Sequence, residues 1–141
     1  MQWLVLATLL AIAPLAGQGE PQDPAGIVAA LQGTWTITHV NGKPLSSLGQ
    51  KSTITFSRDT YSVTTNGQFK ERGTFRIHGK TAPLQIDMRM IEGISPGIVQ
   101  IGIIQVASGT LALKTNTLGS PQRPADFRAD PKYVLYVARK N

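Results

Sequence analysis

The chain contains no cysteine, only two histidines and only eight acidic residues among its 141 residues. Without cysteine there is no disulfide to hold the fold and no lipid attachment through an N-terminal cysteine, so stability has to come from packing. His39 and His78 do not stand at metal-ligand spacing with a second histidine or a carboxylate, so we predict no metal site.

Catalytic motifs are also missing. The sequence has no G-x-S-x-G elbow, no Walker loop, no Rossmann glycine fingerprint and no H-E-x-x-H motif. Asp87 and Glu92 are close in sequence, but Asp87 falls on the polar face of an expected strand and Glu92 in an expected loop. We therefore expect solvated carboxylates rather than an acid/base pair. The prediction is a protein that is not an enzyme, with no catalytic residue and no cofactor.

The charge of the chain is unbalanced, with 14 Lys and Arg against eight Asp and Glu, which gives a net charge of +6. The basic residues are scattered and mostly stand beside turns, where solvated charge is expected. Nucleic-acid binding would require a basic stripe interleaved with exposed aromatic residues, and none is visible. Long-range attraction to an anionic polymer or lipid surface stays open.

Only one long hydrophobic run occurs, at residues 1–13, and it is followed by Pro14 and the small residues Ala16, Gly17 and Gly19. The run is shorter than the ~20 residues that a transmembrane helix needs. It is typical of a signal peptide. We predict a signal peptide over 1–19, a tether over 20–22 and a folded domain over 23–141, exported to the periplasm or outside the cell. After cleavage no stable membrane anchor remains; an uncleaved anchor is the weaker alternative.

Glycine and proline are plentiful, with 14 and nine residues, as in short strands joined by turns. Asp23 and Pro24 predict the start of a short helix, and Asn66-Gly67 predicts a hairpin turn. Alternating residues predict eight strands, at 34–40, 52–56, 60–65, 69–77, 84–90, 98–106, around 111–113 and at 133–137. The fold class is therefore all-β, an eight-stranded antiparallel up-and-down barrel with a short N-terminal helix, because closure removes exposed strand edges.

Two segments resist assignment. Residues 98–106 are apolar on both faces around Gly102, so their facing is left open and Gly102 is expected to mark a bend or bulge. Residues 116–131 form a long proline-marked loop, which is either functional or an ordered strap that plugs one barrel end.

The segment Leu31-Gln-Gly-Thr-Trp35 resembles the G-x-W opening of lipocalins. With it stands an ordered set of further motifs: Asn41-Gly-Lys-Pro44, Gly73-Thr-Phe75, Ile86-Asp87, Gly102-Ile103, Leu111-Ala-Leu113, and Arg123-Pro124 with Phe127. The set is similar to the small lipocalin-like domain of exported planctomycete-type proteins. This resemblance spans about residues 27–140 and implies that Gly33, Trp35 and Arg139 close one barrel end, with Arg139 stacked on the Trp35 indole.

An eight-stranded barrel is either filled by side chains or holds one small ligand. The leading hypothesis is a non-enzymatic module that binds a small apolar or amphipathic ligand in a mouth rimmed by residues 41–51, 91–97 and 116–131. The expected lining consists of Ile37, His39, Ile54, Phe56, Tyr61, Val63, Phe75, Ile86, Met88, Leu113 and Leu135. The alternative is a structural or interaction module of the cell envelope, in which a filled barrel docks a protein or an anionic polymer by its basic surface.

Overall fold

A computed structural model describes residues 23–117 and 120–141 of the protein. The expected signal peptide over 1–19 and the tether over 20–22 lie outside the described residues. Within the described ranges, none of the helices combines the length and the apolar character needed to cross a membrane.

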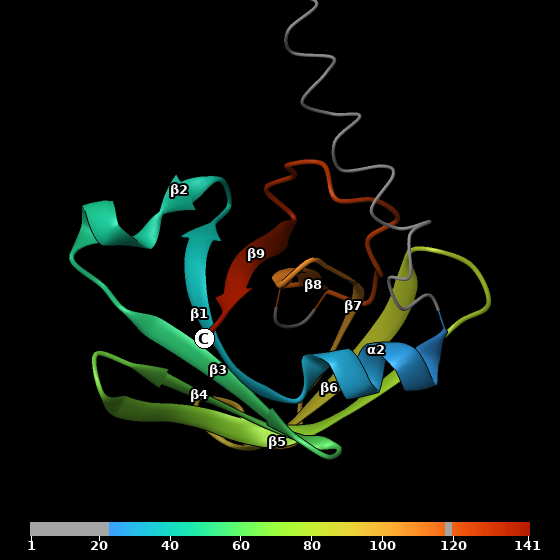
Figure 1. Ribbon diagram of the computed structural model, residues 1–141, viewed down its shortest axis with the longest axis horizontal. Coiled ribbons are helices and arrows are strands. Elements are labelled where there is room, and N and C mark those ends of the chain that lie inside the picture. The colour runs from blue at the N-terminus through green and yellow to red at the C-terminus, as the bar shows by residue number, and fades with distance from the viewer. Residues whose placement is uncertain (1–22, 118–119) are drawn as a thin grey trace, which may run out of the picture.

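Eight antiparallel strands form a closed barrel (Figure 1). They are β1 (Gly33–Val40), β3 (Ser52–Ser57), β4 (Thr60–Thr65), β5 (Gln68–His78), β6 (Leu84–Glu92), β7 (Val99–Ala107), β8 (Thr110–Asn116) and β9 (Tyr133–Lys140). Each strand pairs with the next, and β9 returns to pair with β1, so the sheet has no free edge along these strands. A two-residue strand β2 (Lys43–Pro44) and the 3-10 helix η1 (Leu45–Leu48) follow β1. The predicted fold class is confirmed.

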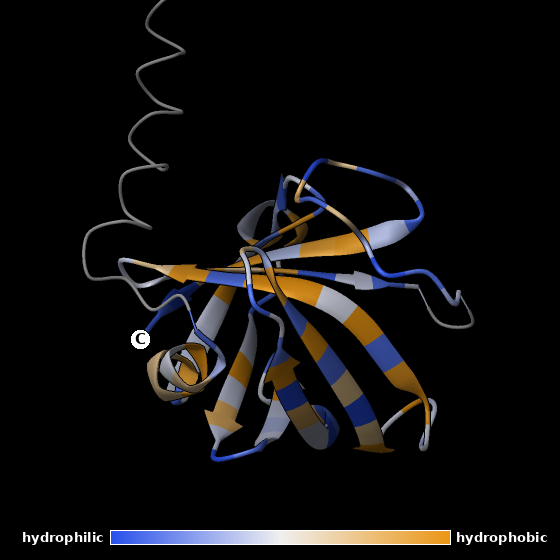
Figure 2. Cartoon of the chain, turned by 90° about the vertical axis from the view of Figure 1, so that its right-hand side faces the viewer, coloured by the Kyte–Doolittle hydropathy of each residue, from blue (hydrophilic) through white to orange (hydrophobic). Residues whose placement is uncertain are grey.

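The strands alternate between hydrophobic and hydrophilic residues, as the bands in Figure 2 show. In β6, Leu84, Ile86 and Met88 are buried, whereas Gln85 and Asp87 between them are only half-buried. This period of two places one row of side chains inside the barrel and the other outside. The alternation read from the sequence therefore gives the correct facing for this strand.

Strand β7 is apolar on both faces because both faces are covered. Ile104 and Val106 belong to the barrel core, so Ile103, the residue before Ile104, faces outward, yet it is only 2% exposed. Gly102 is a site of close approach: a Cβ atom there would lie 2.2 Å from the carbonyl oxygen of Lys114 on β8. Only glycine allows β7 and β8 to pass so near each other at this position.

One end of the barrel, which we call the closed end, carries helix α2 (Pro24–Leu31) and the turns β3–β4, β5–β6 and β7–β8. Asp23 caps the helix, since its Oδ1 accepts a hydrogen bond from the Gly26 amide at 3.1 Å. Ile27 and Leu31 are buried against the core. The Gln32 amide then ties the helix to the β3–β4 turn, because it donates to Arg58 O and accepts from Arg58 N.

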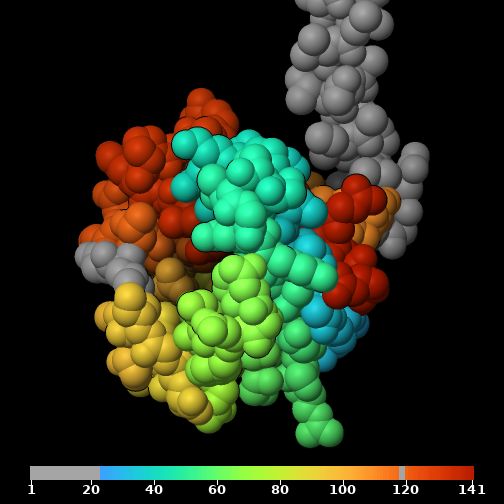
Figure 3. Space-filling view, turned by 90° about the vertical axis from the view of Figure 1, so that its left-hand side faces the viewer, coloured from blue at the N-terminus to red at the C-terminus, as the bar shows by residue number. Residues whose placement is uncertain are grey.

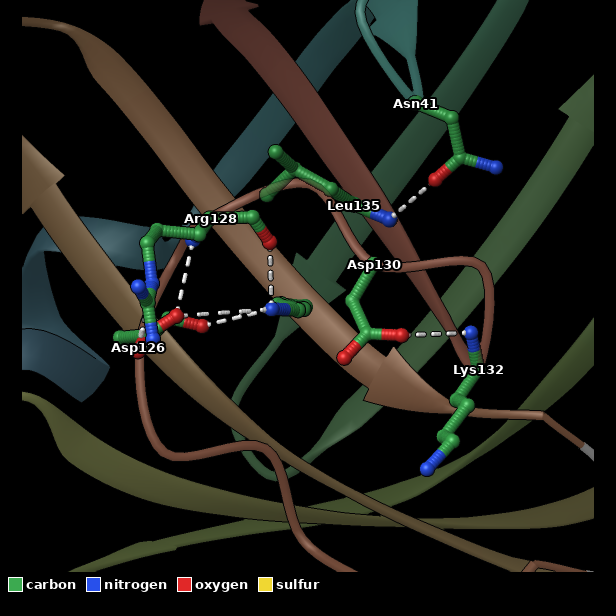
Figure 4. A network of polar contacts seen from close by, with 7 residues as sticks. Asn41, Asp126, Arg128, Asp130, Lys132 and Leu135 are labelled. Atoms are coloured by element: carbon green, nitrogen blue, oxygen red, sulfur yellow. Dashed lines mark hydrogen bonds and ion pairs between the residues drawn. The ribbon is translucent and has the colours of Figure 1, made fainter.

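The other end, which we call the open end, carries residues 41–51, the β4–β5 turn, the β6–β7 loop and the segment before β9. Figure 3 looks toward this end and shows a hollow between these segments. Asn41 fixes one side of it, since its backbone N donates to Leu135 O and its Oδ1 accepts from Leu135 N (Figure 4).

Residues 120–132, which we call the strap, lie against the outer wall of the barrel. Lys114 projects outward because its neighbours Leu113 and Thr115 face the interior, and its Nζ donates to the carbonyl oxygens of Asp126 and Arg128 at 2.8 and 2.6 Å. Arg123 donates to the carbonyl oxygens of Ile86 and Gly102 on neighbouring strands. Of the two interpretations of residues 116–131, these contacts favour an ordered strap, but one that is anchored on the barrel wall.

The strap is held by its own charges as well. Arg128 donates from its backbone N and its Nε to the carboxylate of Asp126, and this hydrogen bonding holds the pKa of Asp126 below its ordinary value (Figure 4). Lys114 is buried beneath this pair, and its ammonium lies 5.0 Å from the centre of the Tyr133 ring. A buried cation with two carbonyl acceptors and an aromatic face is well compensated for its lost hydration.

Candidate ligand cavity in the open half of the barrel

The half of the barrel next to the closed end is packed solid. Trp35 is fully buried, and its Nε1 donates to the carbonyl oxygen of Leu31 at 2.7 Å. Phe56 and Phe75 meet edge to face, with ring centres 5.2 Å apart and planes at 80°. This geometry is favoured for aromatic pairs, so these rings act as core rather than as cavity lining.

The residue that closes this end is Lys140, and the expectation for Arg139 is corrected. Lys140 Nζ lies 5.3 Å from the centre of the Trp35 ring and donates to the carbonyl oxygens of Ala30 and Gln32. Ala138 faces the interior, so the period of two turns Arg139 outward and Lys140 inward. Gly33 has a φ of +112° and lies directly beneath Lys140. Gly33 therefore belongs to the closed end, as expected.

The half next to the open end contains a cavity of about 80 Å³. Its apolar lining comes from six of the eight barrel strands: Ile37, Ile54, Val63, Met88, Leu111, Leu113 and Ala138. Tyr61, Glu71, Gln100, Thr115 and Tyr136 add polar atoms. Pockets for drug-sized ligands measure ~300–1,000 Å³, so this cavity suits a much smaller molecule.

A carboxylate and a phenol are paired at the cavity. The Tyr61 hydroxyl donates to Glu71 Oε2 at 2.8 Å. Burial, followed by the hydrogen bond to Glu71, raises the pKa of Tyr61 well above its ordinary value of 10.0, and burial also raises the pKa of Tyr136. Gly73 makes room for this arrangement, because a Cβ atom there would lie 2.9 Å from the Tyr61 ring and 1.9 Å from Arg89 O.

A second polar group at the cavity lacks a partner. Thr115 is 2% exposed, and its Oγ1 is the one buried side-chain N or O atom in the described ranges without a hydrogen-bond partner. A buried hydroxyl without a partner costs free energy, so native proteins seldom leave one. Thr115 borders the cavity, and within the protein its Oγ1 has no hydrogen-bond partner.

Six of the residues predicted to line a ligand do line this cavity: Ile37, Ile54, Tyr61, Val63, Met88 and Leu113. Phe56, Phe75 and Ile86 also face inward, but they lie in the packed half. The expectations for His39 and Leu135 are wrong, for different reasons.

His39 faces away from the cavity because β1 is irregular. Pairing with β9 shifts in register between Ile37 and His39, which inserts Thr38 as an extra residue. Such a bulge reverses the facing of the residues that follow. Val40 therefore packs against the core, while His39 Nδ1 lies 2.9 Å from Thr38 Oγ1.

Leu135 faces outward, beside Lys114, and Tyr136 takes the inner position. Strand β9 is apolar on both faces, and its outer residue Leu135 is half-buried beside Lys114, whose ammonium the strap binds. Because both rows of this strand are apolar, the sequence alone did not show which row faces the interior, and the prediction chose the wrong one.

The sequence prediction missed six lining residues: Glu71, Gln100, Leu111, Thr115, Tyr136 and Ala138. Leu111 and Thr115 share the parity of Leu113, and Glu71 shares the parity of Phe75. Glu71 is therefore a carboxylate in a row of otherwise uncharged, inward-facing residues, and this feature could have been recognised in the sequence.

Outside the barrel, polar side chains form wall contacts. Asp87 accepts from Arg123 Nη2 at 2.7 Å and lies 3.0 Å from His78 Nε2, so His78 is partnered rather than simply solvated. Glu92 lies at the end of β6 rather than in a loop, and it pairs with Arg72. Asp87 and Glu92 thus have separate partners, and the expectation that both are simply solvated is corrected.

Comparison with known proteins gives one match. Residues 31–119, well over half of the chain, match the model of the lipocalin-like domain family. No curated protein and no solved structure matches the chain. Together, the family match and the closed eight-stranded barrel with its indole-sealed end lead to one conclusion. The chain belongs to the lipocalin-like domain family.

Proposed function

We propose that the protein is a non-enzymatic module that binds a small amphipathic molecule in the open half of its barrel. The observation that carries this proposal is the division of the interior, which is packed at one end and hollow at the other. The deep part of the hollow is apolar, at Leu111 and Leu113 on β8. Farther along β8 toward the open end, Thr115 adds a hydroxyl.

The position of the polar groups supports an amphipathic rather than a purely apolar ligand. Glu71 lies in β5 only four residues beyond Gly67 of the β4–β5 turn, and therefore near the open end. An apolar body would bury its surface among the aliphatic side chains, at about 25 cal/mol per Å² removed from water. A polar head would then meet Glu71 and Thr115.

Binding rather than catalysis is supported by what surrounds these groups. Glu71 has Tyr61 as its hydrogen-bond partner, and the described part of the chain brings no histidine or second carboxylate into the cavity lining. General acid/base chemistry needs a proton donor or acceptor with a matching partner in reach of the substrate. Lipocalin-like proteins are typically ligand-binding and non-enzymatic, which agrees with this assignment.

The alternative, a docking module with a basic surface, has weaker support. A shallow groove on the outer face of β5 and β6 contains Arg76 and Arg89, but Asp59 and Asp87 line it as well. Two carboxylates beside two guanidinium groups give little net attraction for an anionic polymer. If docking dominates, association with heparin should weaken steeply between low and high salt.

We also propose that the protein is exported, on the basis of the apolar run at residues 1–13 and the small residues at 16–19. N-terminal sequencing of the protein recovered from its host tests this. A mature chain that begins between residues 17 and 23 supports export, and an intact Met1 contradicts it.

The binding proposal is tested by NMR titration of the protein with 1-butanol. We expect the amide signals of cavity-lining residues to shift, and the Val63→Phe variant, which fills the cavity from its wall, to lose this response. Ser62→Phe is the matched control, since Ser62 is the neighbouring residue on the outer face of β4. The proposal fails if the shifts spread over the outer wall or if both variants respond like the original protein.

A further inference from the structure

We infer that the ligand class of this cavity is a small primary amine, bound as its ammonium ion with the cation at Glu71 and Thr115 and an alkyl body toward Leu113. This inference rests on the binding function proposed above and specifies its ligand. It stands on two independent features, a carboxylate without a cationic partner and a buried hydroxyl without a hydrogen-bond partner.

The first feature is the charge of Glu71. Five ion pairs occur among the described residues, and Glu71 takes part in none of them. Its neighbours Lys70 and Arg72 occupy the opposite, outward face of β5, where Arg72 pairs with Glu92. A carboxylate that borders a cavity of low polarity attracts a cation more strongly than one in water, because the surrounding dielectric is low.

The second feature is the number and kind of hydrogen-bonding atoms. An ammonium group offers three N–H donors and no acceptor. The cavity offers the Glu71 carboxylate, the unpartnered Thr115 Oγ1 and the side chain of Gln100. All three residues border the same cavity of about 80 Å³. A bound ammonium would satisfy the buried hydroxyl, which then acts as an acceptor.

The aromatic residues of the cavity favour the same sign of charge. Tyr61 and Tyr136 both border it, and the face of a tyrosine ring attracts cations. A carboxylate ligand would meet Glu71 instead, and like charges repel. A neutral alcohol would satisfy Thr115 but would leave Glu71 without a countercharge.

The net charge of +6 has little effect on an ammonium ion that is bound next to Glu71. Interactions between exposed charges are largely screened beyond the Debye length, which is ~8 Å at physiological ionic strength. The cation at Glu71 would be within hydrogen-bond distance of its partner. The overall charge therefore slows the approach of a cation more than it weakens the bound state.

The test compares three probes with the same alkyl chain, n-butylamine, 1-butanol and butyrate, by NMR titration at neutral pH. We expect n-butylamine to bind about tenfold more tightly than 1-butanol, since hydrogen bonds between charged groups are stronger than neutral ones. Butyrate should bind more weakly than either. Signals of residues bordering the cavity should report the difference.

Two variants locate the effect. Glu71→Gln keeps an acceptor for the Tyr61 hydroxyl but removes the charge, so it should abolish the preference for the amine over 1-butanol. Thr115→Val should weaken n-butylamine by a smaller factor. Glu92→Gln is the control, because Glu92 is a carboxylate on the outer wall, and it should bind like the original protein.

The outcomes separate this inference from the function on which it rests. If the amine and the alcohol bind equally and Glu71→Gln changes neither, the amine assignment is wrong while the binding function stands. If none of the three probes shifts the cavity signals, and Val63→Phe has no effect either, both proposals are overturned.

Discussion

The two ends of the barrel differ in chemistry although the same alternating strands build both. At the closed end, Trp35 is covered by helix α2, and Lys140 donates to two carbonyl oxygens beside the indole. At the open end, Glu71 and Thr115 border a cavity, and Thr115 Oγ1 has no hydrogen-bond partner. The polar groups at the closed end are thus hydrogen-bonded, whereas one buried hydroxyl at the open end is not.

The proposed binding function requires such a contrast. Residues that are packed and fully hydrogen-bonded resist change, whereas an unfilled cavity forfeits contacts that a ligand can restore. Under the proposed function, the closed end is the rigid support and the open end holds the binding surface. Variants at the closed end should lower the free energy of unfolding more than variants at the open end. One variant at the open end should raise it.

The largest effect is expected for Trp35→Ala at the closed end. The change removes a fully buried indole and its hydrogen bond to Leu31 O, and should lower the free energy of unfolding by about 3–5 kcal/mol. Val63 is half-buried near the open end, and Val63→Ala should lower the free energy of unfolding by only about 1 kcal/mol. Urea denaturation of both variants measures the difference, and equal losses would contradict the division into a packed and a hollow half.

The next effect is a loss of stability in alkali that originates at the open end. The pKa values of Tyr61 and Tyr136 are raised in the folded protein, so above pH 10 the unfolded chain loses these protons first. Stability is unaffected below pH 10 and falls as the pH rises beyond it, by about 1.4 kcal/mol per pH unit for each tyrosine.

Urea denaturation at pH 9, 10 and 11 tests this dependence. The double variant Tyr61→Phe/Tyr136→Phe should show a shallower decline than the original protein over the same range. A decline of equal slope in both proteins would assign the alkaline loss to other groups.

A moderate effect is expected where the helix is joined to the barrel. Gln32 bonds to Val28 O and to both backbone polar groups of Arg58, so Gln32→Ala should lower the free energy of unfolding by about 1–2 kcal/mol. Gln50→Ala, at an exposed position near the open end, is the control. Thermal denaturation should lower Tm for the first variant and leave it nearly unchanged for the second.

The smallest effect is a gain. Thr115→Val replaces a buried hydroxyl that has no hydrogen-bond partner with a methyl group of similar size. In the ligand-free protein we expect the free energy of unfolding to rise by about 0.5–1 kcal/mol. Denaturant unfolding measures it. A clear loss of stability would show that Thr115 Oγ1 is hydrogen-bonded, to water for instance, and would remove one support of the amine assignment.

Much of the fold could be predicted from local sequence, because local rules govern most of it. Asp23 and Pro24 mark the helix start, Asn66-Gly67 marks a turn with two positive φ angles of 53° and 78°, and residues 84–90 of β6 alternate between buried and more exposed side chains. Each of these depends on only a few adjacent residues, so a single sequence is enough to recognise it.

The cavity could be predicted only in part, because its lining depends on contacts between distant segments. The bulge at Thr38 turns His39 away, and nothing near His39 in the sequence marks it. On β9, Leu135 lies beside Lys114, whose ammonium is bound by the strap, so the outer row is apolar as well and the alternation does not reveal the facing of Leu135 and Tyr136.

The sequence by itself determined the all-β class, the strand count, the helix that precedes the first strand and the indole of Trp35 at one end, since periodicity and turn chemistry are local properties. Only the tertiary structure decided that Lys140 and not Arg139 covers that indole, that the strap lies along the wall, and that Glu71 and Thr115 border one cavity. Those outcomes depend on strand register and on closure of the barrel, which bring together residues far apart in the chain.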